Sequence, residues 1–237
     1  MPIVDPPDAR SIMAVAAHPD DVEAWCAGTL ARAIDGGAIV RLLLVTSGDK
    51  GSGDPATDPR ALAMRREDEA REAAHLLGIA EVVFLRHTDG EVENSVALRR
   101  DLIGWIRRWL PEIVFTFDPE HPLPPYFSHR DHRTVGRATL DAIYPLARDP
   151  LAFPEQLRDG LMTHKVGGAW LFASAVADAC VDIAATFERK VAARLAHASQ
   201  TADPVTLPER FRARDSAAGA PVNLPLAEAF TIVTIGR

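Results

Sequence analysis

A histidine and two aspartates stand close together near the start of the sequence, as His18, Asp20 and Asp21. Imidazole nitrogens and carboxylate oxygens both bind zinc, so His18 and Asp21 can ligate one ion. Asp20 then remains free to accept a proton, and a bound cation would remove the repulsion between the two neighbouring carboxylates. The alternative is that the aspartate pair only caps the helix that follows, and this segment alone does not decide between the two roles.

A second group of the same kind is the run SHRDH at residues 128–132. By itself, this run can also be no more than the polar start of a helix. Together, the two groups offer a metal ion three ligands, which are His18, Asp21 and one of the two histidines, His129 or His132. Three protein ligands with an open position for water are typical of catalytic zinc. The remaining carboxylate of the first group can then act as a base on the water, and the remaining histidine can carry a proton or stabilise an oxyanion.

The elements around the two groups place both of them at one edge of a sheet. An apolar run over 12–16 predicts a buried strand before the first group, and the run 113–117 predicts a strand before the second. Further strands are predicted over 39–46, 82–85 and 169–173, with a last strand or packed tail over 230–235, and helices over 24–34, 59–77, 96–110, 133–144 and 183–195. This alternation predicts an α/β fold, a Rossmann-like three-layer sandwich with a mainly parallel central sheet. Such sheets bind ligands at the carboxyl ends of their strands, where the strand order reverses, and there we expect the two groups to meet.

Length, charge and composition narrow the classes of protein. The 237 residues suit a single domain, in which residues 1–10 are expected to form a flexible leader and residues 201–225 a loop or lid. A net charge of −7 disfavours a nucleic-acid partner. No apolar run is long enough to span a bilayer, and the first residues lack the features of a signal peptide, so a cytoplasmic protein is expected. Cys26 and Cys180 are accordingly expected to be reduced and buried.

Two other kinds of active site are disfavoured by the sequence. The glycines of the loop 47–54 could bring the backbone close to a ligand, but the loop does not run directly into a helix, as a phosphate-binding loop would. The sequence contains no Gly-x-Ser-x-Gly elbow, which argues against Ser-His-Asp catalysis. The two His/Asp groups therefore remain the best candidates for chemistry.

With both groups in view, the chain resembles the PIG-L, or LmbE-like, family of metal-dependent N-deacetylases. The run AHPDDVE at 17–23 is similar to the family signature AHPDDxE, and HRDHRTVG at 129–136 is similar to HPDHxxxG, with Arg130 in place of the usual proline. Supporting similarities are an RxxE helix at 66–78, the pair Asp89-Gly90, the run 117–119 and a late HxSQ helix at 190–200. The likeness thus covers most of the chain.

The resemblance implies a metal centre and a base. His18, Asp21 and His132 are implied to bind one zinc ion per chain, with another divalent metal as the alternative. Asp20 is implied to be the general base that deprotonates the water bound there. Zinc lowers the pKa of its water from 15.7 to about 7, which makes hydroxide available at neutral pH.

The same resemblance assigns roles around this centre. His129 is implied to stabilise the tetrahedral intermediate or to protonate the leaving amine, with Asp131 holding its ring. Arg66 and His197 are implied to bind substrate, against the alternatives of a surface ion pair for Arg66 and a hydrogen-bonded helix end for His197. Some relatives carry a tyrosine just before the second signature to help the oxyanion, and the run 126–127 here has phenylalanine at that place and tyrosine one residue before it.

The sequence therefore predicts a zinc-dependent hydrolase that removes an acetyl or related acyl group from the amino group of an N-acetylated amino sugar or glycoconjugate, with N-acetylglucosamine as the implied sugar. One alternative is an amidase acting on a thiol-sugar conjugate. Another is a sugar- or nucleotide-binding module without chemistry. The complete set Asp20, Asp21, His129 and His132 argues against that module, because binding alone needs no base beside a metal. The expected partner is a small-molecule substrate, and the sequence leaves a homo-oligomer open.

Overall fold

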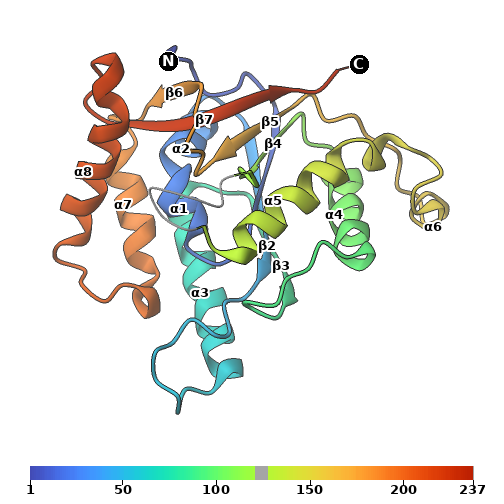
Figure 1. Cartoon of the computed structure of the whole chain (residues 1–237), viewed down its shortest axis with the longest axis horizontal. Helices are drawn as coiled ribbons and strands as arrows, with labels where there is room; N and C mark the ends of the chain where they lie inside the picture. The colour runs from blue at the N-terminus through green and yellow to red at the C-terminus, as the bar shows by residue number, and fades with distance from the viewer. Residues whose placement is uncertain (121–127, 237) are drawn as a thin grey trace.

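The computed structural model describes residues 1–120 and 128–236. The strands of these residues form one sheet in the order β3-β2-β1-β4-β5-β7-β6 (Figure 1). They are β1 Ser11–Ala16, β2 Ile39–Thr46, β3 Glu81–His87, β4 Ile113–Phe117, β5 Gly168–Phe172, β6 Ala179–Asp182 and β7 Ala227–Thr234. The first five strands run parallel to one another, whereas β7 runs antiparallel to both β5 and β6. The predicted α/β fold with a mainly parallel central sheet is therefore confirmed.

The centre of the sheet is made of apolar strands because helices cover both of its faces. β1 and β4 lie side by side, with Ile12 opposite Ile113, and all of their residues except the first of each strand are buried. The strand order reverses between them, since β2 and β3 lie beyond β1, and β5 lies beyond β4. The carboxyl ends of β1 and β4 thus flank the place where sheets of this kind bind ligands.

The helices form the two outer layers. They are α1 Asp21–Trp25, α2 Ala27–Asp35, α3 Pro59–Leu77, α4 Val96–Trp109, α5 Arg130–Ile143, α6 Pro154–Arg158, α7 Phe187–Ala196 and α8 Leu207–Gly219, with 3-10 turns at Leu146–Arg148, Ala198–Gln200 and Ala220–Val222. α2, α3 and α7 pack together on one face of the sheet, and α4 packs with α5 on the other (Figure 1). Side-chain caps begin α3 and α4: the side chains of Asp58 and Ser95 accept from the N–H groups of Arg60 and Leu98.

Two predicted helices differ most from the structure in their bounds. The helix expected over 24–34 is divided into α1 and α2 at Cys26, where the backbone leaves the helical region. The late helix begins at Phe187 rather than next to Asp182, because Asp182 ends strand β6 and the chain needs four more residues before its first helical turn.

The prediction of a loop over 201–225 is wrong, because α8 lies within it. The buried positions of α8 are Leu207, Phe211, Asp215 and Gly219. A charged residue and a glycine thus interrupt the apolar repeat that normally indicates a helix. Asp215 is buried because its carboxylate lies 2.7 Å from Nζ of the fully buried Lys190 on α7. Glu228 of β7 pairs with the same ammonium at 2.6 Å, so that α7, α8 and β7 meet at one point.

Residues 1–10 do not form the expected flexible leader. The N–H of Val4 donates to the carbonyl of Cys180 at 2.9 Å, and the N–H of Cys180 donates to the carbonyl of Pro2 at 3.1 Å. The start of the chain thus lies along β6, a short strand that the sequence pattern did not predict. Both cysteines are free and buried, as expected. Among the residues that the structure describes, no helix has the length and apolar character needed to cross a membrane.

Candidate active site

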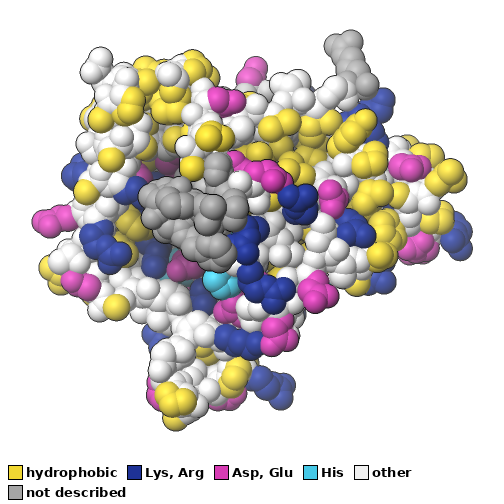
Figure 2. Space-filling model, in the orientation of Figure 1, with side chains coloured by type: hydrophobic (Ala, Val, Ile, Leu, Met, Phe, Trp, Pro, Cys, Tyr) yellow, Lys and Arg dark blue, Asp and Glu magenta, His cyan; other side chains and the backbone are white. Residues whose placement is uncertain are grey.

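The two predicted His/Asp groups meet in one cavity, at the point where the strand order reverses. The first group occupies the turn between β1 and α1, and the second begins α5. The cavity has a volume of about 390 Å³ and is lined by His18, Asp20, Lys50, Gly51, Arg66, Asp89, Gly90, His129, His132 and Gln200. Figure 2 shows a histidine in this part of the surface, surrounded by acidic and basic side chains. A cavity of about 450 Å³ between α5 and β7 contains none of the predicted site residues.

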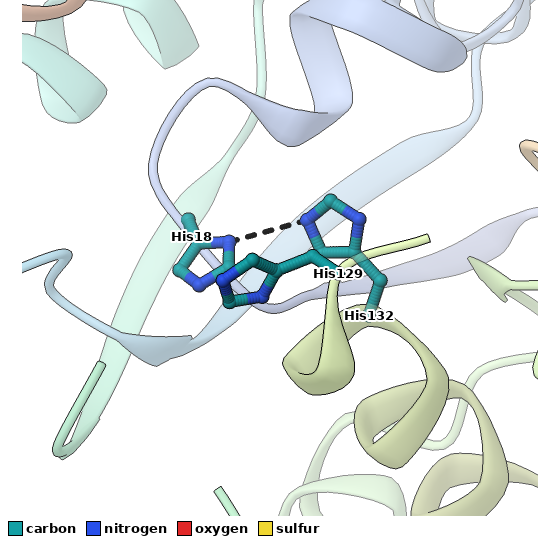
Figure 3. Close-up of side chains that lie close together, drawn as sticks. All are labelled: His18, His129 and His132. Atoms are coloured by element: carbon teal, nitrogen blue, oxygen red, sulfur yellow. Dashed lines mark hydrogen bonds between the residues drawn. The ribbon is translucent and has the colours of Figure 1, made fainter. Parts of the chain in front are cut away.

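Three side chains of the two groups direct potential ligand atoms toward one another. Nδ1 of His18 lies 3.2 Å from Nε2 of His132 (Figure 3), and this Nε2 lies 3.1 Å from Oδ1 of Asp21. Oδ2 of Asp21 lies 3.5 Å from Nδ1 of His18. Ligand atoms at about 2.0–2.1 Å from a tetrahedral ion are about 3.3–3.4 Å apart. The three side chains therefore already have the spacing of one face of a zinc site.

The second ring nitrogen of His18 faces two further carboxylates. Nε2 lies 3.0 Å from Oδ1 of Asp89 and 3.4 Å from Oδ2 of Asp131. Metal-binding histidines commonly donate their other N–H to a carboxylate, which fixes the orientation of the ring. The ring of His132 is fixed differently, because it stacks on Phe117 with the ring centroids 3.9 Å apart. Each of the two imidazoles thus has its own support.

The carboxylates around His18 determine the charge of the site. Burial lowers the pKa of His18, but hydrogen bonds to three aspartates, Asp131 first, more than compensate and raise this pKa to about 12. Burial raises the pKa of Asp21, yet the charge and hydrogen bond of His132, followed by those of His18, hold it well below its usual range. A buried group of carboxylates around one imidazole favours a cation, and nitrogen and oxygen donors of this kind suit zinc and related divalent metals.

Two other sets of ligand atoms also gather within 4.8 Å of one another among the described residues. One is His18 with His129 and His132, and the other is His18 with Asp89 and Asp131. We prefer the set of His18, Asp21 and His132, because Nε2 of His132 contacts both of the other residues. Nδ1 of His129 is already occupied, since it accepts from the backbone N–H of Asp131 at 3.2 Å. The ligand set remains a prediction that metal-binding variants can test.

Asp20 stands beside these ligands with its backbone in the left-handed region, at a φ of 97°. Such strained residues occur often at active sites. Its side chain makes no capping hydrogen bond, so the alternative of a simple helix cap is not supported. The carboxylate lies 3.4 Å from Nη2 of Arg66 and 3.3 Å from Nη2 of Arg194. Burial, and after it the charge of Asp21, raises the pKa of Asp20, while the two arginines oppose this shift.

Arg66 of α3 joins the turn after β1 to the loop after β2. Its guanidinium donates to the carbonyls of Pro19 at 2.7 Å and Gly48 at 3.0 Å, and the side chain is buried. The loop needs its glycines because a Cβ added to Gly48 or Gly51 would lie 2.2 Å from Nη1 of Arg66. The close backbone approach expected of the loop 47–54 is therefore made to a side chain of the protein. The surface ion pair considered for Arg66 is absent, since its guanidinium is buried in these contacts.

His129 and Asp131 are arranged differently from the prediction. His129 is the N-cap residue of α5, and it is the backbone N–H of Asp131 that holds its ring. The carboxylate of Asp131 is buried beside His18 and accepts from the N–H groups of Gly90 at 2.7 Å and Val92 at 3.3 Å. Burial, and then the charge of His18, lowers the pKa of His129, which favours the neutral ring. With Nδ1 as acceptor, the neutral ring carries its proton on Nε2.

His197, predicted to bind substrate, does not line the cavity. Its side chain is fully buried, and Nε2 lies 3.4 Å from Oε2 of Glu23, which is also buried. α7 ends at Ala196, and the hydroxyl of Thr201 donates to the carbonyl of His197 at 2.9 Å, which turns this residue inward. Gln200 instead reaches the rim of the cavity, where its Nε2 donates to the carbonyl of Gly51 at 3.0 Å.

Two side chains that contact His18 or Asp20 were given no role from the sequence: Asp89, noted only as part of the family resemblance, and Arg194. Asp89 follows β3 at the same edge of the sheet as the first group, so its position after a strand is the signal that could have found it. Arg194 belongs to a helix that carries no metal-binding pattern, and only the folded structure brings it to Asp20. Tyr126 and Phe127, considered for the oxyanion, lie outside the described residues.

Comparisons with known proteins identify the family of this chain. The family model PIG-L, described as GlcNAc-PI de-N-acetylase, matches residues 13–143. The chain is 30% identical over 198 residues to diacetylchitobiose deacetylase of Thermococcus kodakarensis, a match that covers 84% of this chain and 73% of that protein. It is also 30% identical over 171 residues to 1D-myo-inositol 2-acetamido-2-deoxy-alpha-D-glucopyranoside deacetylase of Kineococcus radiotolerans, which covers 59% of this chain but only 46% of that protein.

A solved structure has nearly the same architecture. N,N'-diacetylchitobiose deacetylase from Pyrococcus horikoshii, in complex with an inhibitor, matches with a TM-score of 0.89 and 28% identity, over 96% of this chain and 85% of that chain. The family match covers more than half of this sequence and includes both His/Asp groups. The chain therefore belongs to the PIG-L family of deacetylases.

Proposed function

We propose that this N-deacetylase hydrolyses the acetamide of an N-acetylated amino sugar with one zinc ion held by His18, Asp21 and His132. The observation that carries the proposal is the mutual approach of these three side chains, whose ligand atoms lie 3.1–3.5 Å from one another in each pair, with Asp20 beside them. The two relatives named above support an amino-sugar substrate, because their names specify diacetylchitobiose and a 2-acetamido-2-deoxy-glucopyranoside. The donor set fits other divalent metals as well, and zinc is the ion we expect.

The residues of the cavity have the properties that amide hydrolysis needs. When bound, the ion supplies a Lewis acid and lowers the pKa of a coordinated water to about 7. Asp20 accepts the proton of the attacking water, a task for which a carboxylate with a raised pKa is well suited. Asp89 and Asp131 keep the ring of His18 in place during the reaction.

His129 acts on the developing negative charge of the substrate. Its neutral ring carries the proton on Nε2 and donates it in a hydrogen bond to the amide oxygen as that oxygen becomes an oxyanion. Asp20 then returns the proton that it took from water to the departing nitrogen, so the products are the free amino sugar and acetate. Arg66 lines the cavity and remains a predicted substrate-binding residue.

The decisive experiment is a substrate screen that measures released acetate. N-acetylglucosamine, diacetylchitobiose and other N-acetylated amino-sugar conjugates would be compared with a thiol-sugar amide, with and without a chelator. We expect acetate from at least one amino sugar, loss of that activity with chelator and its return with zinc. Hydrolysis of the thiol-sugar amide alone would favour the amidase instead, and full activity in a chelated enzyme freed of metal would rule out the proposal. A cytoplasmic location and a homo-oligomer remain predictions.

A further inference from the structure

The candidate base, Asp20, is held by a different arginine at each of its two oxygens. Arg66 of α3 lies 3.4 Å from Oδ1, and Arg194 of α7 lies 3.3 Å from Oδ2. The side chains of both arginines are nearly buried, with 4% and 11% exposed, whereas 22% of the side chain of Asp20 faces the cavity. Neither arginine is a predicted metal ligand. What the two arginines share is their contact with the carboxylate of the proposed base.

The guanidinium of Arg194 is also held by hydrogen bonds to residues other than Asp20. Nη1 donates to the hydroxyl of Thr201 at 2.8 Å, and Nη2 donates to the carbonyl of Gln200 at 3.2 Å. Gln200 is bound in turn to the loop at the cavity rim through the carbonyl of Gly51. The planar guanidinium therefore keeps its positive charge in a fixed place 3.3 Å from Oδ2, which a flexible ammonium would not.

We infer that Arg194 is a positioning residue for Asp20, an inference that rests on the proposed role of Asp20 as the base. Arg66 fixes one oxygen but leaves the carboxylate free to rotate about the bond that joins it to Cβ. Arg194 fixes the second oxygen and removes that freedom. Each carboxylate oxygen has two acceptor positions, so the positions not used by the arginines stay available for the proton of water. A small displacement of a catalytic group can reduce turnover by about 100-fold.

Arg194 allows a cleaner test than Arg66, because Arg66 also lines the cavity and binds the turn after β1 through the carbonyl of Pro19. The test compares Arg194→Gln with the matched control Arg189→Gln. Arg189 lies on the same helix, and its guanidinium binds Asp35 and the carbonyl of Ala31 on the outer side of α2. For both variants, we would measure kcat, KM, bound metal per chain and the thermal unfolding midpoint.

We expect Arg194→Gln to lower kcat by about 10- to 100-fold, with KM changed by less than about threefold and one metal still bound per chain. Arg189→Gln should leave kcat unchanged. Thr201→Val separates positioning of the base from support of the segment 197–201, because it removes the hydroxyl that Arg194 binds but not the contact with Asp20. It should retain most of the kcat. A loss in Thr201→Val equal to that in Arg194→Gln would overturn the inference.

A double-mutant cycle with Asp20→Asn completes the test. If Arg194 acts through Asp20, adding Arg194→Gln to Asp20→Asn causes little further loss of the residual turnover. Independent, multiplying effects of the two substitutions would refute the inference. Failure of the inference and of the proposed function can be told apart. If Asp20→Asn is fully active, the proposed base role fails and the inference fails with it. An inactive Asp20→Asn beside a fully active Arg194→Gln removes the inference alone.

Discussion

Nδ1 of His18 and Nε2 of His132 lie 3.2 Å apart, although 114 positions separate the two residues in the sequence. One ring follows β1 and the other belongs to the first turn of α5, and the two strands before them are neighbours at the centre of the sheet. The fold therefore brings the two rings together. An ion between them would connect two parts of the chain that share no covalent link at the site.

Loss of His132 should abolish tight metal binding. His132→Ala removes a nitrogen that contacts both His18 and Asp21, so we expect metal affinity to fall by more than the roughly 100-fold seen when outer residues of a metal site are lost. Metal analysis after dialysis and competition with a chelator would measure this. His75→Ala, at an exposed position of α3, is the control and should bind one ion per chain. If His132→Ala also retains one ion with unchanged affinity, the ligand assignment is wrong.

Asp131 should affect metal affinity although it is not a predicted ligand. Its carboxylate lies 3.4 Å from Nε2 of His18 and accepts from two backbone N–H groups after β3. Asp131→Asn replaces one carboxylate oxygen with an N–H donor, which disturbs the support of His18 and leaves His18, Asp21 and His132 in place. We expect metal affinity to fall by about 10- to 100-fold, as measured by chelator competition. An unchanged affinity would show that His18 needs no support from Asp131.

Two glycines of one loop should respond differently to alanine. A Cβ at Gly51 would lie 2.2 Å from Nη1 of Arg66 and 3.1 Å from Oε1 of Gln200, whereas a Cβ at Gly53 meets nothing within 4 Å. Gly51→Ala therefore displaces Arg66, which holds Asp20, and we expect kcat to fall by about tenfold or more. Gly53→Ala should keep normal kcat. Equal activities of the two variants would contradict the role given to the loop.

Glu67 should stabilise the protein at neutral pH and lose this effect in acid. Hydrogen bonds from Arg86 first, and also from Ser47 and Arg71, lower the pKa of Glu67 from 4.5 to about 2. Because the folded-state pKa is the lower one, ionised Glu67 stabilises the fold above about pH 4.5, and this stabilisation disappears as the pH falls toward about 2.

Glu67→Gln should accordingly lower the thermal unfolding midpoint at pH 7, and the difference from the parent protein should shrink between pH 4.5 and pH 2. Glu72→Gln, at an exposed position of the same helix, is the control and should leave the midpoint unchanged. A Glu67→Gln deficit that stays constant down to the lowest pH would mean that packing of the side chain, and not its charge, accounts for the loss.

The part of the site that the sequence predicts is the part with a local pattern. His18, Asp20 and Asp21 lie in one turn, and His129 to His132 in another, so residue type and position after a strand were sufficient to identify them. Asp89 contributes a single carboxylate after β3, and one aspartate next to a glycine is common in any loop. Arg194 lies on a helix whose buried side chains include none of the predicted site residues, and its role depends on how α7 packs.

The elements of the fold also differ in whether a local pattern in the sequence predicts them. Patterns of apolar residues predicted the five parallel strands and the helices α3 and α4. α8 was missed because Asp215 and Gly219 occupy two of its four buried positions. Asp215 is buried only because Lys190, on another helix, neutralises it, and no pattern within residues 207–219 shows that partner. Elements that depend on such pairs become visible only in three dimensions.

Through the buried ammonium of Lys190, α8 and β7 affect the position of a residue that contacts the proposed base. Lys190 lies one helical turn before Arg194, and its two carboxylate partners come from α8 and β7. Without residues 207–234, that ammonium would be an uncompensated charge inside the protein, and α7 would have to move to bring it into water. Such a movement would carry the guanidinium away from Asp20. A shortened chain can therefore keep every residue that lines the cavity and still be a poor enzyme.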